Sequence, residues 1–201
     1  MSQLGVLAYG SILVDPGGEL REATQHTIKG VTTPFAVEYA RSSSTRGFGP
    51  TLVPVDEGGL PVVGALLVMH PQITLQEARD RLYRREIGEV GSDKTYVHFE
   101  RPGLNRVHLP VLEDFMVVSC AIYTRLGANI EPGSRNADRL AELAIESVHN
   151  ANHGDDGISY LLRMSKLGIA TALSNGYEQE ILRRTKATSL EDALTAIRGG
   201  R

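Results

Sequence analysis

One carboxylate in this sequence stands where it could transfer a proton. Residues 73–86 (ITLQEARDRLYRRE) have the pattern of an amphipathic helix. On a wheel of about 100° per residue, Leu75, Leu82 and Glu86 fall on one side. Glu86 thus ends a core-facing stripe at the negative end of the helix dipole, and both effects disfavour its ionised form, which suits a general base. On this geometry alone a structural role is favoured, in which Glu86 ends the helix in water or pairs with an arginine.

The second feature is the segment LAYGSIL at residues 7–13. An apolar run that stops at Gly10 and Ser11 and resumes with Ile12 has two explanations. It is either a plain turn or a loop whose backbone amides face a ligand, since glycine has no Cβ to obstruct them.

Other reactive side chains are better explained as structural. His149 and His153 are four residues apart, but they lack the H-E-x-x-H pattern of a zinc site. Cys120 could be a nucleophile with His98 or His108 as its base, yet its apolar setting in FMVVSC predicts a buried, inert thiol.

Composition excludes several classes of protein. The chain has 201 residues, of which 41% are hydrophobic and 22% charged, with a net charge of −3. This balance argues against nucleic-acid binding. The apolar run at 62–69 is too short to cross a membrane. The single cysteine fits a reducing compartment, and no signal peptide is recognised, so a cytoplasmic protein is expected.

The elements that must position these residues predict an α+β fold in one domain, residues 1–201. Many short strands with tight turns suggest a mixed or antiparallel sheet curled into a barrel and flanked by helices. The expected strands are 5–9, 31–40, 51–55, 62–69, 95–100, 106–112 and 115–124, with a hairpin turn at 56–59 and a buried central strand at 115–124. Besides 73–86, the expected helices are 136–149, 158–167 and one that opens at Ser189 with Asp192 and stops at Gly199.

Several short motifs resemble the γ-glutamylcyclotransferase family in order and spacing. YGSIL at 9–13 resembles its Tyr-Gly-Ser-Asn-Leu loop, and RREIGE at 84–89 resembles its Arg-Glu-Gly segment with the catalytic glutamate. The segment 35–69 follows the family's order of strands and turns, and GISYLLRMSKLGI at 157–169 is similar to its Tyr-Leu helix. The likeness covers residues 5 to about 170.

The resemblance implies an enzyme that releases 5-oxoproline and a free amine from a small γ-glutamyl amine or peptide, without a metal or organic cofactor. Glu86 would be the catalytic residue. The backbone of the loop would bind the substrate, and tyrosines on neighbouring strands would line the pocket. The substrate-binding residues so implied are Tyr9, Gly10, Ser11, Ile12, Leu13, Tyr96 and Tyr123.

Two departures from the family pattern leave alternatives open. Ile12 stands where the family has asparagine. Ile87 separates Glu86 from Gly88, which the family has adjacent, and this insertion could give the role of Glu86 to Glu89. The first alternative is a non-catalytic small-molecule-binding domain on the same fold. The second is an enzyme that acts on a γ-glutamyl-tagged pathway intermediate. The sequence does not identify the leaving amine, because the specificity for it would lie in loops such as 41–49. It also carries no signal for the oligomeric state.

Overall fold

The computed structural model describes residues 3–100 and 103–199. Its contacts divide the chain into two compact units, each built from two separate stretches. Unit 1 comprises Met1–Thr33 and Val63–Gly127, and unit 2 comprises Pro34–Val62 and Ala128–Arg201. The prediction of one domain over residues 1–201 stays a prediction.

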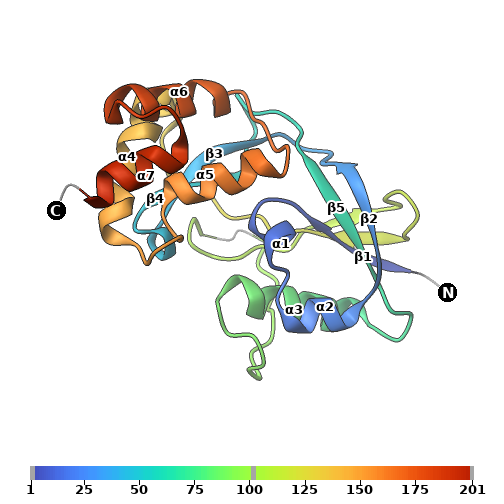
Figure 1. The fold of residues 1–201 in the computed structure, drawn as a ribbon. Coiled ribbons are helices and arrows are strands. Elements are labelled where there is room, and N and C mark those ends of the chain that lie inside the picture. The colour runs from blue at the N-terminus through green and yellow to red at the C-terminus, as the bar shows by residue number, and fades with distance from the viewer. Residues whose placement is uncertain (1–2, 101–102, 200–201) are drawn as a thin grey trace. The chain divides into compact units, whose positions relative to one another are not determined.

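Unit 1 is organised around a mixed sheet of five strands in the order β2-β5-β1-β7-β6 (Figure 1). Strand β1 is antiparallel to β5 and parallel to β7, so it lies at the centre of the sheet. Consecutive residues are buried in β1, β5 and β7, including six of the seven positions of β5. Both faces of this part of the sheet are therefore covered. The strand bounds are β1 Leu4–Ala8, β2 Thr24–Thr32, β5 Val63–Met69, β6 Val111–Glu113 and β7 Cys120–Ile122.

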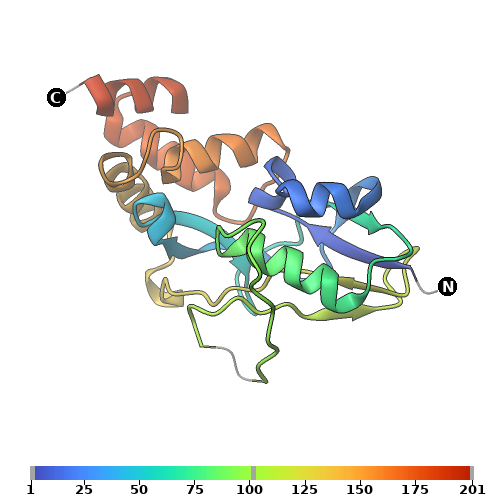
Figure 2. The ribbon, with the colours of Figure 1, turned by 90° about the horizontal axis from the view of Figure 1, so that it is seen from below.

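Three helices belong to unit 1: α1 (Ser11–Val14), α2 (Gly18–Ala23) and α3 (Leu75–Glu86). Helices α2 and α3 are in contact and lie side by side, as Figure 2 shows from below. Helix α3 begins with a capping box between Thr74 and Glu77. Its expected apolar stripe is confirmed, because Ala78 and Leu82 are buried and Leu75 packs against the same core.

Unit 2 combines the antiparallel pair β3–β4 with four helices. The β3 and β4 strands pair from Val37↔Pro54 to Ser43↔Gly49, and α4 packs on β4 and on the other three helices. The bounds are β3 Val37–Ser43, η1 Ser44–Arg46, β4 Gly49–Pro54, η2 Pro132–Ser134, α4 Ala137–Asn150, α5 Gly157–Lys166, α6 Ser174–Thr185 and α7 Leu190–Gly199.

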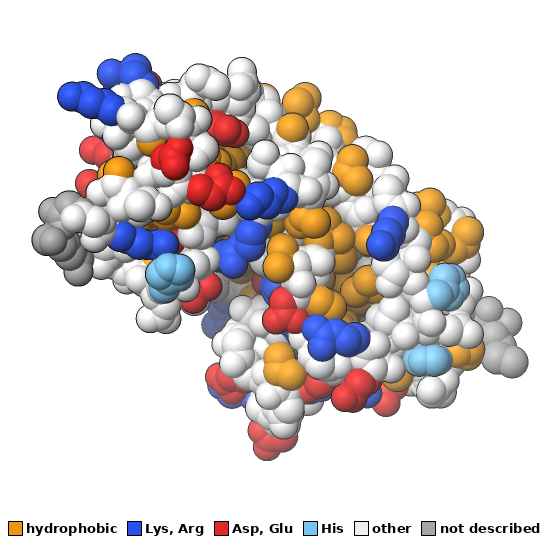
Figure 3. Space-filling view, viewed as in Figure 1, with side chains coloured by type: hydrophobic (Ala, Val, Ile, Leu, Met, Phe, Trp, Pro, Cys, Tyr) orange, Lys and Arg blue, Asp and Glu red, His pale blue; other side chains and the backbone are white. Residues whose placement is uncertain are grey.

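Charged side chains are mostly compensated locally. On the face drawn in Figure 3, basic side chains lie beside acidic ones. In α6, Arg183 and Arg184 both pair with Glu180, and these two bonds lower the pKa of Glu180 to about 2. Arg183 and Arg184 are therefore charge-compensated on the surface of α6.

The predicted helices are confirmed within one or two residues at α3, α4, α5 and α7. Three helices were not predicted. Helices α1 and α2 have only four and six residues, too few for a periodic pattern, and α6 has no side-chain N-cap.

The mixed α+β fold is confirmed, but the described strands form one open sheet and one separate pair and do not close into a barrel. The predicted hairpin around 56–59 is wrong, because β4 pairs with β3 whereas β5 pairs with β1 and β2. The turn instead brings Leu60 beside Val37. A Cβ on Gly59 would lie 2.8 Å from the carbonyl oxygen of Val37, so this close approach requires glycine.

Four other strand predictions are wrong, three of them in extent and one altogether. The run 31–40 is split into the end of β2 and the start of β3 around Pro34, which has no N–H to donate to a ladder. The run 115–124 forms a strand only over Cys120–Ile122, because Asp114 and Met116 take positive φ angles in a turn. Residues 95–100 form no strand, and 106–112 contributes only the start of β6.

Within the described ranges, no helix is both long and apolar enough to span a bilayer.

A pH-dependent contribution to stability is expected from Glu38, which is completely buried in unit 2. Burial raises the pKa of Glu38 above its ordinary value of 4.5, although hydrogen bonds from Thr171 and the amides of Tyr39 and Leu173 oppose the shift. The free energy of unfolding should therefore fall as the pH rises through the folded-state pKa. Urea unfolding at several pH values should show this fall in the wild type.

The fall should be smaller in Glu38→Gln, which carries no titratable group at this position. The exposed Glu57→Gln serves as the control and should keep the wild-type profile. An unchanged profile in Glu38→Gln would contradict the prediction.

Candidate functional site

The candidate base lies on the last residue of α3, and the helix end is sharply defined there. The N–H of Glu89 donates to the carbonyl of Arg84 at 2.8 Å, and the N–H of Gly88 donates to that of Arg85 at 3.3 Å. Gly88 has a φ of 73°, so these bonds form a Schellman motif with glycine in the left-handed position. These hydrogen bonds end the helix at Glu86 and fix the position of its backbone.

Arg85 connects the Glu86 carboxylate to the segment 9–13. Its Nη1 atom lies 2.8 Å from Oε1 of Glu86 and 3.2 Å from Oγ of Ser11. Its Nε and Nη2 atoms donate to the backbone carbonyl of Asp15 at 3.0 and 2.8 Å. One guanidinium thus holds the turn after β1 against the end of α3, although more than 70 residues separate them.

Glu86 has a cationic neighbour, Arg85, that the helical wheel did not predict. Its side chain is only 10% exposed, so desolvation and the helix terminus both disfavour the charge. The guanidinium of Arg85 opposes them, because a cation in contact stabilises an ionised carboxylate. The pairing with an arginine, left open by the sequence, is therefore present.

The segment YGSIL follows the end of β1 and leads into the short helix α1 rather than continuing the strand. Gly10 has a φ of 59° and a ψ of −133°, a conformation that suits glycine. Within the described part of the chain, no side chain caps the first turn of α1, and the N–H of Leu13 donates to the carbonyl of Gly10 at 3.2 Å. The side chain of Ile12 is buried in the core, and Leu13 packs against that core.

The three tyrosines implied by the resemblance are all at least nine-tenths buried. The hydroxyl of Tyr9 donates to the backbone carbonyl of Thr124. The hydroxyl of Tyr96 accepts from the N–H of Leu109 at 3.1 Å, and its own proton is still available for donation. Burial raises the pKa of the Tyr123 hydroxyl, so it stays a neutral hydrogen-bond donor.

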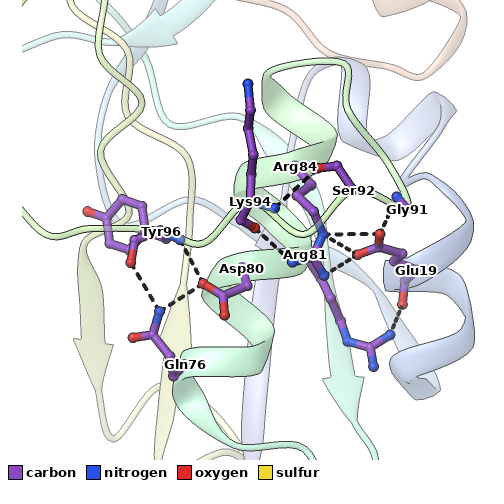
Figure 4. A network of polar contacts seen from close by, with 9 residues as sticks. All are labelled: Glu19, Gln76, Asp80, Arg81, Arg84, Gly91, Ser92, Lys94 and Tyr96. Atoms are coloured by element: carbon purple, nitrogen blue, oxygen red, sulfur yellow. Dashed lines mark hydrogen bonds and ion pairs between the residues drawn. The ribbon is translucent and has the colours of Figure 1, made fainter.

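A second ion pair fixes the orientation of α3. Arg84 binds the carboxylate of Glu19 on α2 through Nε and Nη2, with contacts of 3.1, 2.9 and 2.5 Å (Figure 4). The N–H of Gly91 also donates to Glu19, and Arg81 donates to the Glu19 carbonyl at 3.0 Å. Arg84 further binds the carbonyl of Lys94 at 2.9 Å. Helix α2, helix α3 and the segment after it therefore converge on one carboxylate.

The same helix positions Tyr96 through its backbone. The N–H of Tyr96 donates to Asp80 at 2.7 Å, and its carbonyl accepts from Gln76 at 3.1 Å (Figure 4). The Gln76 amide also donates to Asp80 at 2.8 Å. The side chain of Tyr96 is thereby directed into the core of unit 1, where Ile12 also lies.

Sequence reasoning missed Glu19 and Asp80, and it left open which arginine would pair with Glu86. The RRE sequence was a usable signal, because two cations directly precede a carboxylate at a helix end. Glu19 gave no such signal, since the short helix α2 was not predicted.

The other sequence candidates lie apart from this arrangement. Glu89 lies beyond the helix end, where it is half-buried and pairs with Lys94 at 2.6 Å. Cys120 is buried, and burial raises the pKa of its thiol, as expected of an inert core residue. The rings of His98 and His108 are 5.6 Å apart, and burial is the main cause that lowers the pKa of His108.

Across residues 3–100 and 103–199, no three His, Cys, Asp or Glu side chains are grouped so that they could hold a metal ion. In comparisons with known proteins, no family model matches the chain and no curated protein matches it.

The Glu19–Arg84 pair should contribute measurably to stability, because both side chains are largely buried, with 17% and 15% exposed. Arg84 holds the pKa of Glu19 below its ordinary value of 4.5, so this contribution is present at neutral pH and is lost as the pH falls through the lowered pKa. Glu19→Gln should lower the free energy of unfolding by about 1–3 kcal/mol at pH 7, since charged hydrogen bonds are lost. Urea unfolding measures this change.

Arg21→Gln is the matched control, because the Arg21–Asp15 pair is exposed, with 68% and 70% of the side chains accessible. It should change stability by less than about 1 kcal/mol. Equal effects of the two substitutions would show that the Glu19 network does not stabilise unit 1.

Proposed function

We propose that this protein is a γ-glutamylcyclotransferase-like enzyme that releases 5-oxoproline from a small γ-glutamyl amine or peptide. The observation that carries the proposal is the position of Arg85, whose Nη1 atom touches both Ser11 Oγ and Glu86 Oε1. A carboxylate and a glycine-containing turn from distant parts of the chain are thus brought together. The proposal includes the fold of that family, which the sequence motifs suggest.

The reaction needs orientation and proton transfer more than a strong nucleophile. The α-amine of the γ-glutamyl group attacks its own γ-carbonyl carbon, and a five-membered lactam forms as the bond to the leaving nitrogen breaks. Glu86 takes a proton from the α-ammonium and passes one to the leaving nitrogen. Because the nucleophile is already tethered to the carbonyl, correct positioning supplies much of the acceleration.

The turn at Gly10 and Ser11 supplies the electrostatic part of this proposal. Backbone N–H groups at the start of α1 would donate to the oxygen on which negative charge develops. The hydroxyl protons of Tyr96 and Tyr123 would add hydrogen bonds to the substrate. Arg85 acts as a positioning residue that holds Glu86 beside this turn.

A non-catalytic binding domain is the second candidate, and one observation favours it. The Arg85–Glu86 ion pair stabilises the ionised carboxylate, which suits a ligand-pairing or structural role as well as a base. The same turn and carboxylate could then bind a γ-glutamyl group without turnover.

Release of 5-oxoproline from a panel of γ-glutamyl amines and peptides, glutathione included, distinguishes the two functions. Glu86→Gln preserves the shape of the side chain but removes the base, so kcat should fall by roughly 10²-fold or more. Glu89→Gln is the matched control and should retain activity, because Glu89 lies beyond the helix end and is paired with Lys94.

Three outcomes would contradict the assignment. If Glu89→Gln is inactive and Glu86→Gln is active, Glu89 is the base. If both variants are active, neither carboxylate is essential. If no substrate yields 5-oxoproline while γ-glutamyl compounds still bind, the protein is a binding domain.

The role of Arg85 is tested by Arg85→Met. Loss of the neighbouring cation removes a stabilisation of the ionised Glu86 carboxylate, so the acid limb of the pH dependence of kcat/KM should move to higher pH. Arg21→Gln removes an exposed arginine and should leave the profile unchanged. A reduced rate with an unmoved acid limb would show that Arg85 acts only on the fold.

A further inference from the structure

A pocket of about 380 Å³ opens in unit 1 beside the end of α3. This volume falls within the range of about 300–1,000 Å³ that is typical of small-molecule sites. Two of its lining residues, Tyr83 and Ile87, belong to the last turn of α3 and its C-cap. Tyr83 precedes Glu86 by three positions, so the two share one side of the helix, and Ile87 is the C-cap that follows Glu86.

The other lining residues belong to the segments 95–99 and 105–107. Val97, Phe99 and Val107 contribute apolar surface. Val97 is 60% exposed and Phe99 is 39% exposed, which is costly for apolar groups unless a partner covers them. The lining therefore favours an apolar body in the occupant.

Arg106 supplies the polar recognition group. Its Cζ atom lies 4.2 Å from the centre of the Phe99 ring, in cation–π geometry. Among the described residues, no carboxylate pairs with Arg106, in contrast to Arg84 and Arg85 on the helix. A guanidinium without an acidic partner, held on an aromatic ring at a pocket wall, favours a carboxylate in the occupant.

We propose that this pocket binds the leaving half of the substrate, and that this half is an apolar or aromatic amino acid whose free carboxylate pairs with Arg106. The inference rests on the proposed function for the identity of the substrate as a γ-glutamyl compound. It deepens that function by naming the class of leaving amine. Ile87, which interrupts the family motif, then serves as a wall of the leaving-group site.

Binding can be tested without turnover. 3-Phenylpropanoate carries the apolar body and the carboxylate, whereas 3-phenylpropanamide lacks only the charge. Titration followed by NMR should shift the amide signals of Tyr83, Ile87, Thr95 and Val107, and the anion should bind about tenfold more tightly than the amide, which corresponds to about 1.4 kcal/mol. Equal binding of the two probes, or shifts elsewhere, would overturn the inference.

Two variants separate the charge from the apolar surface. Arg106→Gln should abolish the preference for the anion, and Val97→Ser, at an exposed position, should weaken both probes alike. Arg21→Gln is the arginine control and should bind as the wild type does. An unchanged preference in Arg106→Gln would exclude Arg106 as the carboxylate partner.

Kinetics then connect the pocket to the reaction. γ-Glutamyl-phenylalanine should give a kcat/KM about tenfold above that of γ-glutamyl-phenethylamine, and Arg106→Gln should remove the difference. Equal rates for the two substrates would overturn the inference and leave the proposed function intact. Arg106-dependent binding without any 5-oxoproline would instead overturn the proposed function and leave the pocket's anion preference standing.

Discussion

The ion pair between Glu19 and Arg84 is the constraint on which the arrangement of unit 1 depends. Neither side chain can be removed without leaving a largely buried charge unpaired, which is costly. Through this pair the short helix α2 is joined to α3, and the amide of Gly91 and the carbonyl of Lys94 are fixed at the same point. The candidate base and the segment that leads to Tyr96 therefore have defined positions before any ligand binds.

Two neighbouring arginines at the end of α3 bind two different segments of the chain. Arg84 connects the helix to α2, and Arg85 connects it to the turn that follows β1. They follow each other in sequence and so lie about 100° apart around the helix. This separation lets one helical turn fix two different segments, while Leu82 on the same helix faces the core.

The sequence predicted the elements that have a strong local signal. The capping box of α3, its buried stripe and the glycine stop at Gly88 were all readable. Pairing between strands was not, because the local turn signal at 56–59 competes with the long-range pairing of β5 with β1 and β2. The network at Glu19 was also unreadable, since it joins residues more than 60 positions apart. In the candidate site, sequence located Glu86 and Ser11, but only the structure revealed that Arg85 connects them.

The attachment of the turn to α3 depends on main-chain chemistry more than on side chains. Arg85 binds the carbonyl oxygen of Asp15, which every amino acid carries, while the Asp15 side chain is exposed. The two bonds from Arg85 therefore do not depend on the side chain at position 15, whereas position 85 must supply a forked cation. Homologous chains could thus diverge widely along the turn and still hold it in place, as long as the arginine persists.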